Sequence, residues 1–87
     1  MARYSLEIKP SATREIEDLP TKKQRRLVVD RISNLAHDPR PPGCEKLGGQ
    51  ERYRVRQGAY RIVYEIEDTT HVVRVIKVAH RKEVYRR

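Results

Sequence analysis

Apolar and polar residues alternate along four stretches of the chain, and this period of two predicts four β-strands. The stretches are residues 3–9, 52–56, 60–67 and 71–80. In the first, Tyr4, Leu6 and Ile8 fall on one face, whereas charged and hydroxyl-bearing side chains fall on the other. The last stretch carries valine or isoleucine on both faces, which is typical of a strand inside a sheet.

The segment after the first strand repeats its apolar residues at helical spacing instead. Ala12, Ile16 and Leu19 predict a short helix with an N-cap at Ser11 and an end before Pro20. Such a helix has one apolar stripe, which we expect to pack on the sheet.

A longer helix is predicted directly afterwards. Thr21, followed by Gln24 three residues later, fits a capping box at its start, and Asp38 and Pro39 end it. Its apolar stripe consists of Val28, Ile32, Leu35 and Ala36. The rest of its surface is basic, with Lys22, Lys23, Arg25, Arg26 and Arg31.

Turn signals separate the remaining strands, with Gly48 and Gly49 before the second strand and Gln57 and Gly58 in a tight hairpin. The predicted order is βααβββ, an α+β fold with two N-terminal helices packed on one face of a small, mostly antiparallel sheet. With 87 residues in all, residues 1–87 are expected to form a single domain. The opposite face of the sheet is left open, so a binding site is expected there.

Arginines gather on the face predicted to be open. Arg52, Arg54 and Arg56 alternate with Tyr53 and Val55, and Arg61 follows on the next strand. The sequence has no carboxylate between residues 52 and 61 to balance this charge. We therefore expect an anionic ligand on this face, and a phosphodiester backbone is the leading candidate because guanidinium groups bind phosphate oxygens in pairs. Tyr53, Tyr60 and Tyr64 have the opposite parity and are expected in the core.

The overall charge points the same way. Lysine and arginine outnumber aspartate and glutamate by 20 to 12, a formal net charge of +8 at pH 7. An excess of this size favours nucleic acid, an anionic membrane surface or an acidic protein as partner.

Metal and disulfide chemistry is not expected. Cys44 is the only cysteine, which rules out an internal disulfide and a thiolate cluster. His37, His71 and His80 lie far apart without metal-ligand spacing, so we expect no metal and no other cofactor. No run of residues resembles a signal peptide or a transmembrane helix, which predicts a cytoplasmic location and no membrane partner.

The segment YRVRQGAYRIVYEI (53–66), followed by an acidic turn and a valine-rich strand closing in HRKEVY (80–85), resembles the RelE/ParE superfamily of bacterial and archaeal toxins. The KLGG turn at residues 46–49, the βααβββ order and the length agree with this resemblance, which covers essentially the whole chain. Such proteins are the toxins of type II toxin–antitoxin pairs. RelE-like members cut mRNA in the ribosomal A site, whereas ParE-like members inhibit DNA gyrase.

The resemblance to the RelE-like branch implies a set of catalytic residues. Arg54 and Arg56 occupy the positions of two basic residues on the strand after the KLxG turn, where lysine is common in other members. A basic residue follows the hairpin, here Arg61, another closes the last strand, here Arg81, and a tyrosine follows it, here Tyr85. Arg52 and Lys82 are assigned to RNA binding.

The implied reaction is transesterification without metal or water, in which the RNA 2′-hydroxyl attacks the adjacent phosphate and releases a 5′-hydroxyl. Arg61 and Arg81 suit the stabilisation of charge on the phosphate, with Arg81 beside the leaving 5′-oxygen. Tyr85 suits stacking on the base or orientation of the sugar. Arginine is a poor general base at neutral pH, so either Arg54 and Arg56 act only electrostatically or His80 transfers a proton.

Structural interpretations compete with these roles. Arg52, Arg54 and Arg56 fit plain solvated charges, and Arg61 fits an ion pair with Glu65. His80 fits a hydrogen-bonded strand end, and Tyr85 fits packing on the sheet.

The resemblance also implies partners: mRNA on the ribosome, ribosomal RNA, with which the basic face of the second helix is one candidate contact, and a cognate RelB-like antitoxin with an acidic, partly disordered segment. Two other functions stay open. One is inhibition of DNA gyrase by the same fold, and the other is a basic RNA- or protein-binding module without catalysis.

Overall fold

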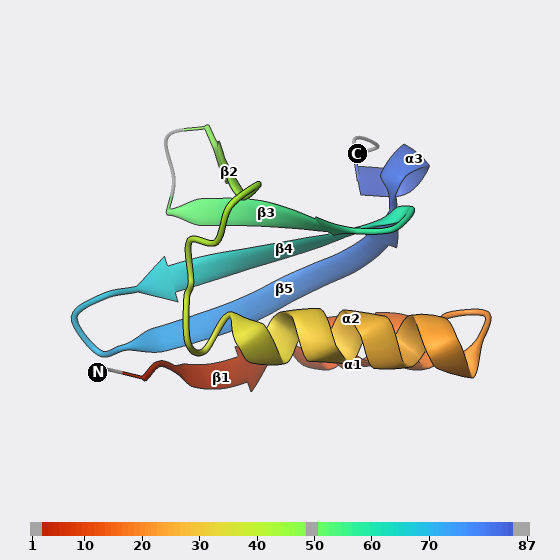
Figure 1. The fold of residues 1–87 in the computed structure, drawn as a ribbon, viewed down its shortest axis with the longest axis horizontal. Helices are drawn as coiled ribbons and strands as arrows, with labels where there is room; N and C mark the ends of the chain where they lie inside the picture. The colour runs from red at the N-terminus through yellow and green to blue at the C-terminus, as the bar shows by residue number, and fades with distance from the viewer. Residues whose placement is uncertain (1–2, 49–50, 85–87) are drawn as a thin grey trace.

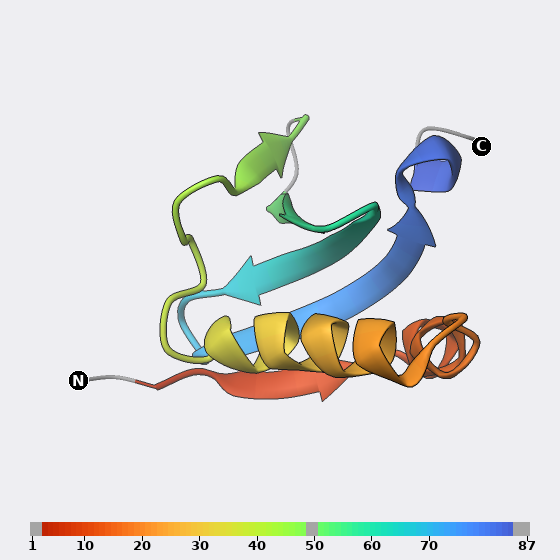
Figure 2. The ribbon, with the colours of Figure 1, turned by 45° about the vertical axis from the view of Figure 1, so that its right-hand side comes forward.

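The computed structural model describes residues 3–48 and 51–84 of the chain, and it has the predicted α+β architecture. A five-stranded sheet carries two N-terminal helices on one face (Figures 1 and 2). Along the chain the elements are β1 (Ser5–Ile8), α1 (Pro10–Glu17), α2 (Lys22–Asn34), β2 (Glu45–Leu47), β3 (Arg52–Gln57), β4 (Tyr60–Glu67), β5 (Val72–His80) and α3 (Arg81–Val84). None of the helices among these residues is long and apolar enough to cross a membrane.

The strand order is β1-β5-β4-β3-β2, so β5 lies inside the sheet as its two apolar faces predicted. β1 runs parallel to β5, and every other pair is antiparallel. The order of elements is βααβββ with two additions that the sequence pattern did not indicate. These are the three-residue edge strand β2 and the four-residue helix α3, both too short to show a period.

The edge strand β2 covers only part of β3. Its pairing extends from Leu47 opposite Arg52 to Glu45 opposite Arg54. Beyond Arg54 the described part of the sheet has no further strand on that side, so the end of β3 near Gln57 is an exposed edge.

Helix α1 begins earlier than predicted. Its N-cap is Lys9, and Pro10 occupies the first turn, so the prediction of an N-cap at Ser11 was wrong. Proline suits this position because its φ is already helical and the missing N–H would have no partner there. The helix ends at Glu17, yet Leu19 beyond it is still buried, as its apolar character predicted.

The predicted cap of α2 is confirmed in part. The Thr21 Oγ1 accepts a hydrogen bond from the backbone N–H of Gln24 at 3.1 Å. The return bond of a capping box is missing, because the Gln24 Oε1 is buried without a hydrogen-bond partner. Leu35, the C-cap, and Ala36 are buried beyond the last turn.

The core lies between the two helices and the inner sheet face. Ala12, Ile16, Val28 and Ile32 of the helices pack against Val55, Ile62, Tyr64, Val73 and Val75 of the strands. Tyr53 and Tyr64 are buried as predicted, whereas Tyr60 is only half-buried. Strict alternation fails in β5 at a β-bulge, where Val63 pairs with Lys77 but Tyr64 pairs with Val75, so that Ile76 is the extra residue. In β4 Val63 lies opposite Arg54, so it faces the side away from the helices, and it is still buried.

Side-chain contacts attach the connector between α2 and β2 to strands β3 and β4 and to the turn after β4. Tyr64 donates a hydrogen bond to the Pro39 carbonyl at 2.7 Å. Arg40 stacks over the Tyr53 ring at 5.0 Å and forms an ion pair with Asp68 at 3.0 Å. These contacts fix the path of the chain just before it forms β2, and so they fix the position of β2.

Candidate nucleic-acid interface

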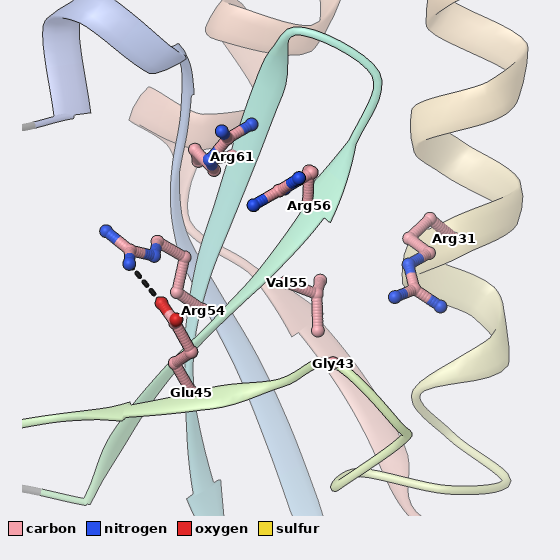
Figure 3. Close-up of a pocket in the computed structure, with 7 residues that line it drawn as sticks. All are labelled: Arg31, Gly43, Glu45, Arg54, Val55, Arg56 and Arg61. Carbon is pink, nitrogen blue, oxygen red and sulfur yellow. Dashed lines mark hydrogen bonds and ion pairs between the residues drawn. The ribbon is translucent and has the colours of Figure 1, made fainter.

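Three of the predicted arginines meet in one groove of about 610 Å³ beside β3 (Figure 3). It is lined by Arg31, Gly43, Glu45, Arg54, Val55, Arg56 and Arg61. Arg54, Arg56 and Arg61 come from the sheet face that α1 and α2 leave uncovered, which we call the open face. Val55 belongs to the core and Arg31 to α2, so the groove runs from the open face around the exposed edge of β3 to the helix side.

Arg56 and Arg61 lie directly opposite each other on β3 and β4. Like charges in opposed register on one sheet face destabilise a sheet. The Arg61 guanidinium is held near the hairpin, because it donates hydrogen bonds to the carbonyls of Gly58 at 3.3 Å and Tyr60 at 3.2 Å. Gly58 has a φ of 60°, which allows the two-residue turn that sets this register. The backbone register therefore places the two cationic side chains side by side on one sheet face, and an anion bound between them would relieve their repulsion.

Arg54 and Glu45 form an ion pair at the other end of the groove. The Arg54 side chain is only 14% exposed, whereas that of Glu45 is 61% exposed. The Arg54 guanidinium lowers the pKa of the Glu45 carboxyl below its usual value, and Arg56 adds to this effect. Glu45 is therefore ionised at neutral pH and borders the same groove as the arginines.

The sequence interpretation missed Glu45 as part of this site. No carboxylate lies between residues 52 and 61, but β2 brings one into the cluster from outside that range. The signal available in the sequence was the charged pair Glu45-Lys46 directly before Leu47 and the glycine turn. It is too short to predict a strand by periodicity.

Arg31 was also missed as a member of the site. The sequence placed it on the general basic surface of α2, but the structure directs its side chain from α2 toward the space beside Val55 (Figure 3). It is half-buried, unlike Arg26 on the same helix, which is exposed.

Arg52 lies outside the groove in a row of alternating charges. The row crosses four strands in direct register, from Glu7 through Arg74 and Glu65 to Arg52. Its ion pairs are 2.9 Å, 3.4 Å and 3.1 Å long, respectively. Among the described residues Glu65 pairs with these two arginines, so the ion pair between Arg61 and Glu65 that the sequence allowed is not formed.

The C-terminal candidates are placed apart from the groove. His80 pairs with Tyr60 on the helix side of the sheet, and their rings meet edge to face at 5.7 Å. Its Nδ1 accepts a hydrogen bond from the Lys82 backbone at 3.2 Å, so His80 has the structural contacts of a strand end. Arg81 and Lys82 are exposed on α3 and do not line the groove. Tyr85 lies outside the described residues.

A second hollow of about 370 Å³ lies at the end of β5 beside α1. His80 and Tyr60 line it together with acidic side chains that include Glu15, Asp18 and Glu83. Its charge is therefore unlike that of the arginine groove. Within residues 3–48 and 51–84, no group of three or more His, Cys, Asp or Glu side chains is placed to hold a metal ion.

Comparisons with known proteins agree over almost the full length. Residues 6–85 match the model of a protein family described as ParE toxin of type II toxin-antitoxin system, parDE. Toxin RelG of Mycobacterium tuberculosis is 29% identical, with 97% of this chain and 98% of that protein covered. Toxin RelE of the same organism is 32% identical, with 95% of this chain and 87% of that protein covered. In the crystal structure of the archaeal RelE-RelB complex from Pyrococcus horikoshii, one chain matches with a TM-score of 0.81 and 26% identity, covering 93% of this chain and 97% of that one.

Proposed function

Since the chain belongs to the ParE toxin family of type II toxin–antitoxin systems, we propose that it is a RelE-like toxin that stops translation by cutting mRNA in the ribosomal A site. The similarity to proteins named RelG and RelE supports the RelE-like branch of this family. The observation that carries the proposal is the direct opposition of Arg56 and Arg61 in the groove, because this pair is destabilising without an anion and suits a phosphodiester.

In the proposed reaction the RNA provides its own nucleophile. The 2′-oxygen bonds to the adjacent phosphorus and the bond from phosphorus to the 5′-oxygen breaks. The departing 5′-oxygen takes a proton from solvent, so the products are a 2′,3′-cyclic phosphate and a 5′-hydroxyl. Arg56 and Arg61 grip the phosphate oxygens and stabilise the charge that develops on them. Removal of one such preorganised donor typically costs about 10²–10³-fold in rate.

We assign the proton of the 2′-hydroxyl to Glu45. Among the described residues that line the groove, Glu45 is the one with a carboxylate. It is ionised at neutral pH and lies near the guanidinium groups of Arg54, Arg56 and Arg61. Because its pKa is lowered it is a weak base, so it accepts the proton as the bond from oxygen to phosphorus forms and that proton becomes acidic. Arg54 holds the Glu45 side chain in place. The position of His80 on the helix side favours Glu45 over His80 for this role.

The roles of Arg81 and Tyr85 rest on their positions in the family pattern. Arg81 would stand beside the leaving 5′-oxygen, and Tyr85 would stack on a base. Arg81 begins α3, and its backbone N–H donates to the Ala59 carbonyl in the hairpin turn at 2.7 Å, which ties α3 to the hairpin that carries Arg61.

An antitoxin is the expected protein partner. The relative from P. horikoshii was crystallised as a RelE-RelB complex. A RelB-like protein with an acidic segment would complement the net charge of +8 of this chain.

Primer extension on an mRNA in a purified translation system tests the proposal. The wild-type protein should create new 5′ ends inside codons, and Arg61→Ala should reduce them by about 10²–10³-fold. Arg14→Ala, which removes the same charge from the exposed surface of α1, is the matched control. Intact mRNA at protein concentrations that block protein synthesis would refute the nuclease assignment.

Gyrase inhibition is the second candidate, because the matching family model is that of ParE toxins. A DNA supercoiling assay with purified gyrase separates the two. Inhibition of supercoiling together with uncut mRNA would select the gyrase function.

A further inference from the structure

We infer that Arg31 of α2 binds a second phosphate of the RNA, next to the cleaved linkage, where the strand passes around the exposed edge of β3. This inference rests on the proposed function and extends it, because it assigns a path to the RNA. The first observation is that Arg31 lines the same groove as Arg54, Arg56 and Arg61 although it comes from the opposite side of the sheet.

The exposed edge of β3 makes this path possible. β2 pairs with β3 only as far as Arg54, so no described strand covers β3 from Val55 to Gln57 on that side. Val55 forms the floor between the open face and Arg31. Gly43 borders the groove at its other side, and a Cβ there would meet nothing within 4 Å, so the backbone leaves open space at this point. An RNA strand bound at Arg56 can therefore pass over the exposed edge of β3 and reach Arg31.

Arg31 also differs in its contacts from most arginines that are only partly exposed. Arg25 donates to the Leu19 carbonyl at 2.9 Å, and Arg74 pairs with Glu7 at 2.9 Å. Among the described residues no carboxylate lies within 4.0 Å of the Arg31 guanidinium, although its side chain is half-buried. A half-buried guanidinium without a carboxylate in a basic groove suits an external anion.

The repeated negative charge of a nucleic acid strand favours an RNA backbone as that anion. A nucleic acid strand carries one negative charge at every nucleotide, so a strand that places one phosphate between Arg56 and Arg61 presents its neighbours along the groove. Arg31 then contributes affinity and direction to the strand, while the chemistry stays at the open face.

The test measures binding of a fluorescent 2′-O-methyl RNA, which lacks the attacking hydroxyl and stays intact, by the purified protein without ribosomes. Arg31→Ala should weaken binding on the order of 10-fold, as expected for a lost charge-assisted hydrogen bond. The slope of log K against log salt should become shallower by about 0.7, the contribution of one phosphate contact on a single strand. Arg26→Ala removes the same charge from the same helix and should leave affinity and slope near wild type.

Two further variants guard against a folding defect. Arg31→Gln keeps much of the length of the side chain without its charge, and Arg31→Lys keeps the charge. At a temperature where thermal unfolding shows both to be folded, the glutamine variant should lose binding and the lysine variant should retain most of it.

The outcomes separate this inference from the proposed function. Equal affinity and salt slope for the Arg31→Ala and Arg26→Ala variants, or no binding of the RNA by the wild-type protein, would overturn the role of Arg31 even if mRNA is cut on the ribosome. Arg31-dependent binding without any cleavage in the translation system would support the role of Arg31 and remove the nuclease function.

Discussion

At the scale of single residues, the site is defined by charges that are not neutralised. Elsewhere on the open face each arginine meets a carboxylate in direct register, as in the row from Glu7 to Arg52. The pair of Arg56 and Arg61 lies two same-face positions along the strands from that row, beyond Arg54 and Val63, and there the alternation of sign breaks down. A protein stabilises such a pair by binding an anion there, which is the reason to place the substrate phosphate at this point.

The repulsion between these two arginines leads to a prediction about stability and activity together. Arg56→Gln should lower the cleavage rate by about 10²–10³-fold, yet it should leave the free energy of unfolding unchanged or raise it by up to about 1 kcal/mol, since a like-charge cross-strand pair is removed. Cleavage assays and urea unfolding of the same preparations check both parts. Arg14→Gln, on the exposed surface of α1, is the matched control for the loss of charge. A clear loss of stability in Arg56→Gln would contradict the repulsion argument.

Glu45 gives a second prediction, which concerns pH. Its pKa is lowered below the usual value of 4.5, chiefly by its hydrogen bond from Arg54, so the ionised form persists through mildly acidic solution. If Glu45 is the general base, the cleavage rate should not change with the ionisation of Glu45 until the pH falls below the usual glutamate value of 4.5. Glu45→Gln should reduce single-turnover cleavage by about 10²–10⁴-fold and abolish the fall in rate at acidic pH.

The same variant separates catalysis from binding. Because a negative charge is removed from a basic groove, Glu45→Gln should bind uncleavable RNA at least as tightly as the wild type. Glu51→Gln, directly before β3 and outside the groove, is the control for the charge change. If Glu45→Gln loses binding and cleavage in equal measure, Glu45 is a structural partner of Arg54 and the base lies elsewhere.

At the scale of elements, periodicity was sufficient for the long segments and failed for the short ones. Four strands, two helices and the inner position of β5 followed from apolar spacing, because each segment is long enough to repeat a pattern. β2 has three residues, and the bulge at Ile76 of β5 depends on pairing with β4, so neither could be predicted from a period in the sequence. The arginines of β3 and β4 could therefore be predicted as neighbours, whereas Glu45 and Arg31 could not, since their positions depend on β2 and on the packing of α2.

The contact that fixes the path toward β2 yields the third prediction. Asp68 accepts hydrogen bonds from Arg40 and Tyr4, and the Arg40 guanidinium is the main cause of its lowered pKa. A carboxyl whose pKa is lowered by folding stabilises the fold above its unfolded-state pKa, and this contribution is lost as the pH falls through the folded-state value. Asp68→Asn should therefore lower the urea midpoint near neutral pH, and the difference from wild type should shrink as the pH falls below about 4.

A matched control for this change is Asp30→Asn, on the exposed surface of α2. It should not alter the midpoint in a way that depends on acidic pH. A gap between Asp68→Asn and wild type that stays constant down to pH values well below the usual pKa of aspartate would show that the carboxylate charge is not what holds the connector.

At the scale of the whole molecule, the net charge of +8 is unevenly distributed. One part of the open face is neutralised by ion pairs and stabilises the sheet, while the groove around β3 keeps its positive charge for a ligand. Binding of RNA should therefore depend on the few arginines of the groove and not on total charge.

The salt dependence of binding tests this division. At about 0.7 per phosphate contact on a single strand, the two phosphates assigned to the groove, one between Arg56 and Arg61 and one at Arg31, predict a slope of log K against log salt of about −1.4 for uncleavable RNA. Arg74→Gln lowers the net charge by the same amount as Arg31→Ala, but Arg74 belongs to the neutralised row. It should keep the wild-type slope and reduce stability, because Glu7, Glu65 and Glu67 lose their shared partner. A slope that became shallower by the same amount in both variants would mean that RNA responds to the overall charge of the protein and not to the arginines of the groove.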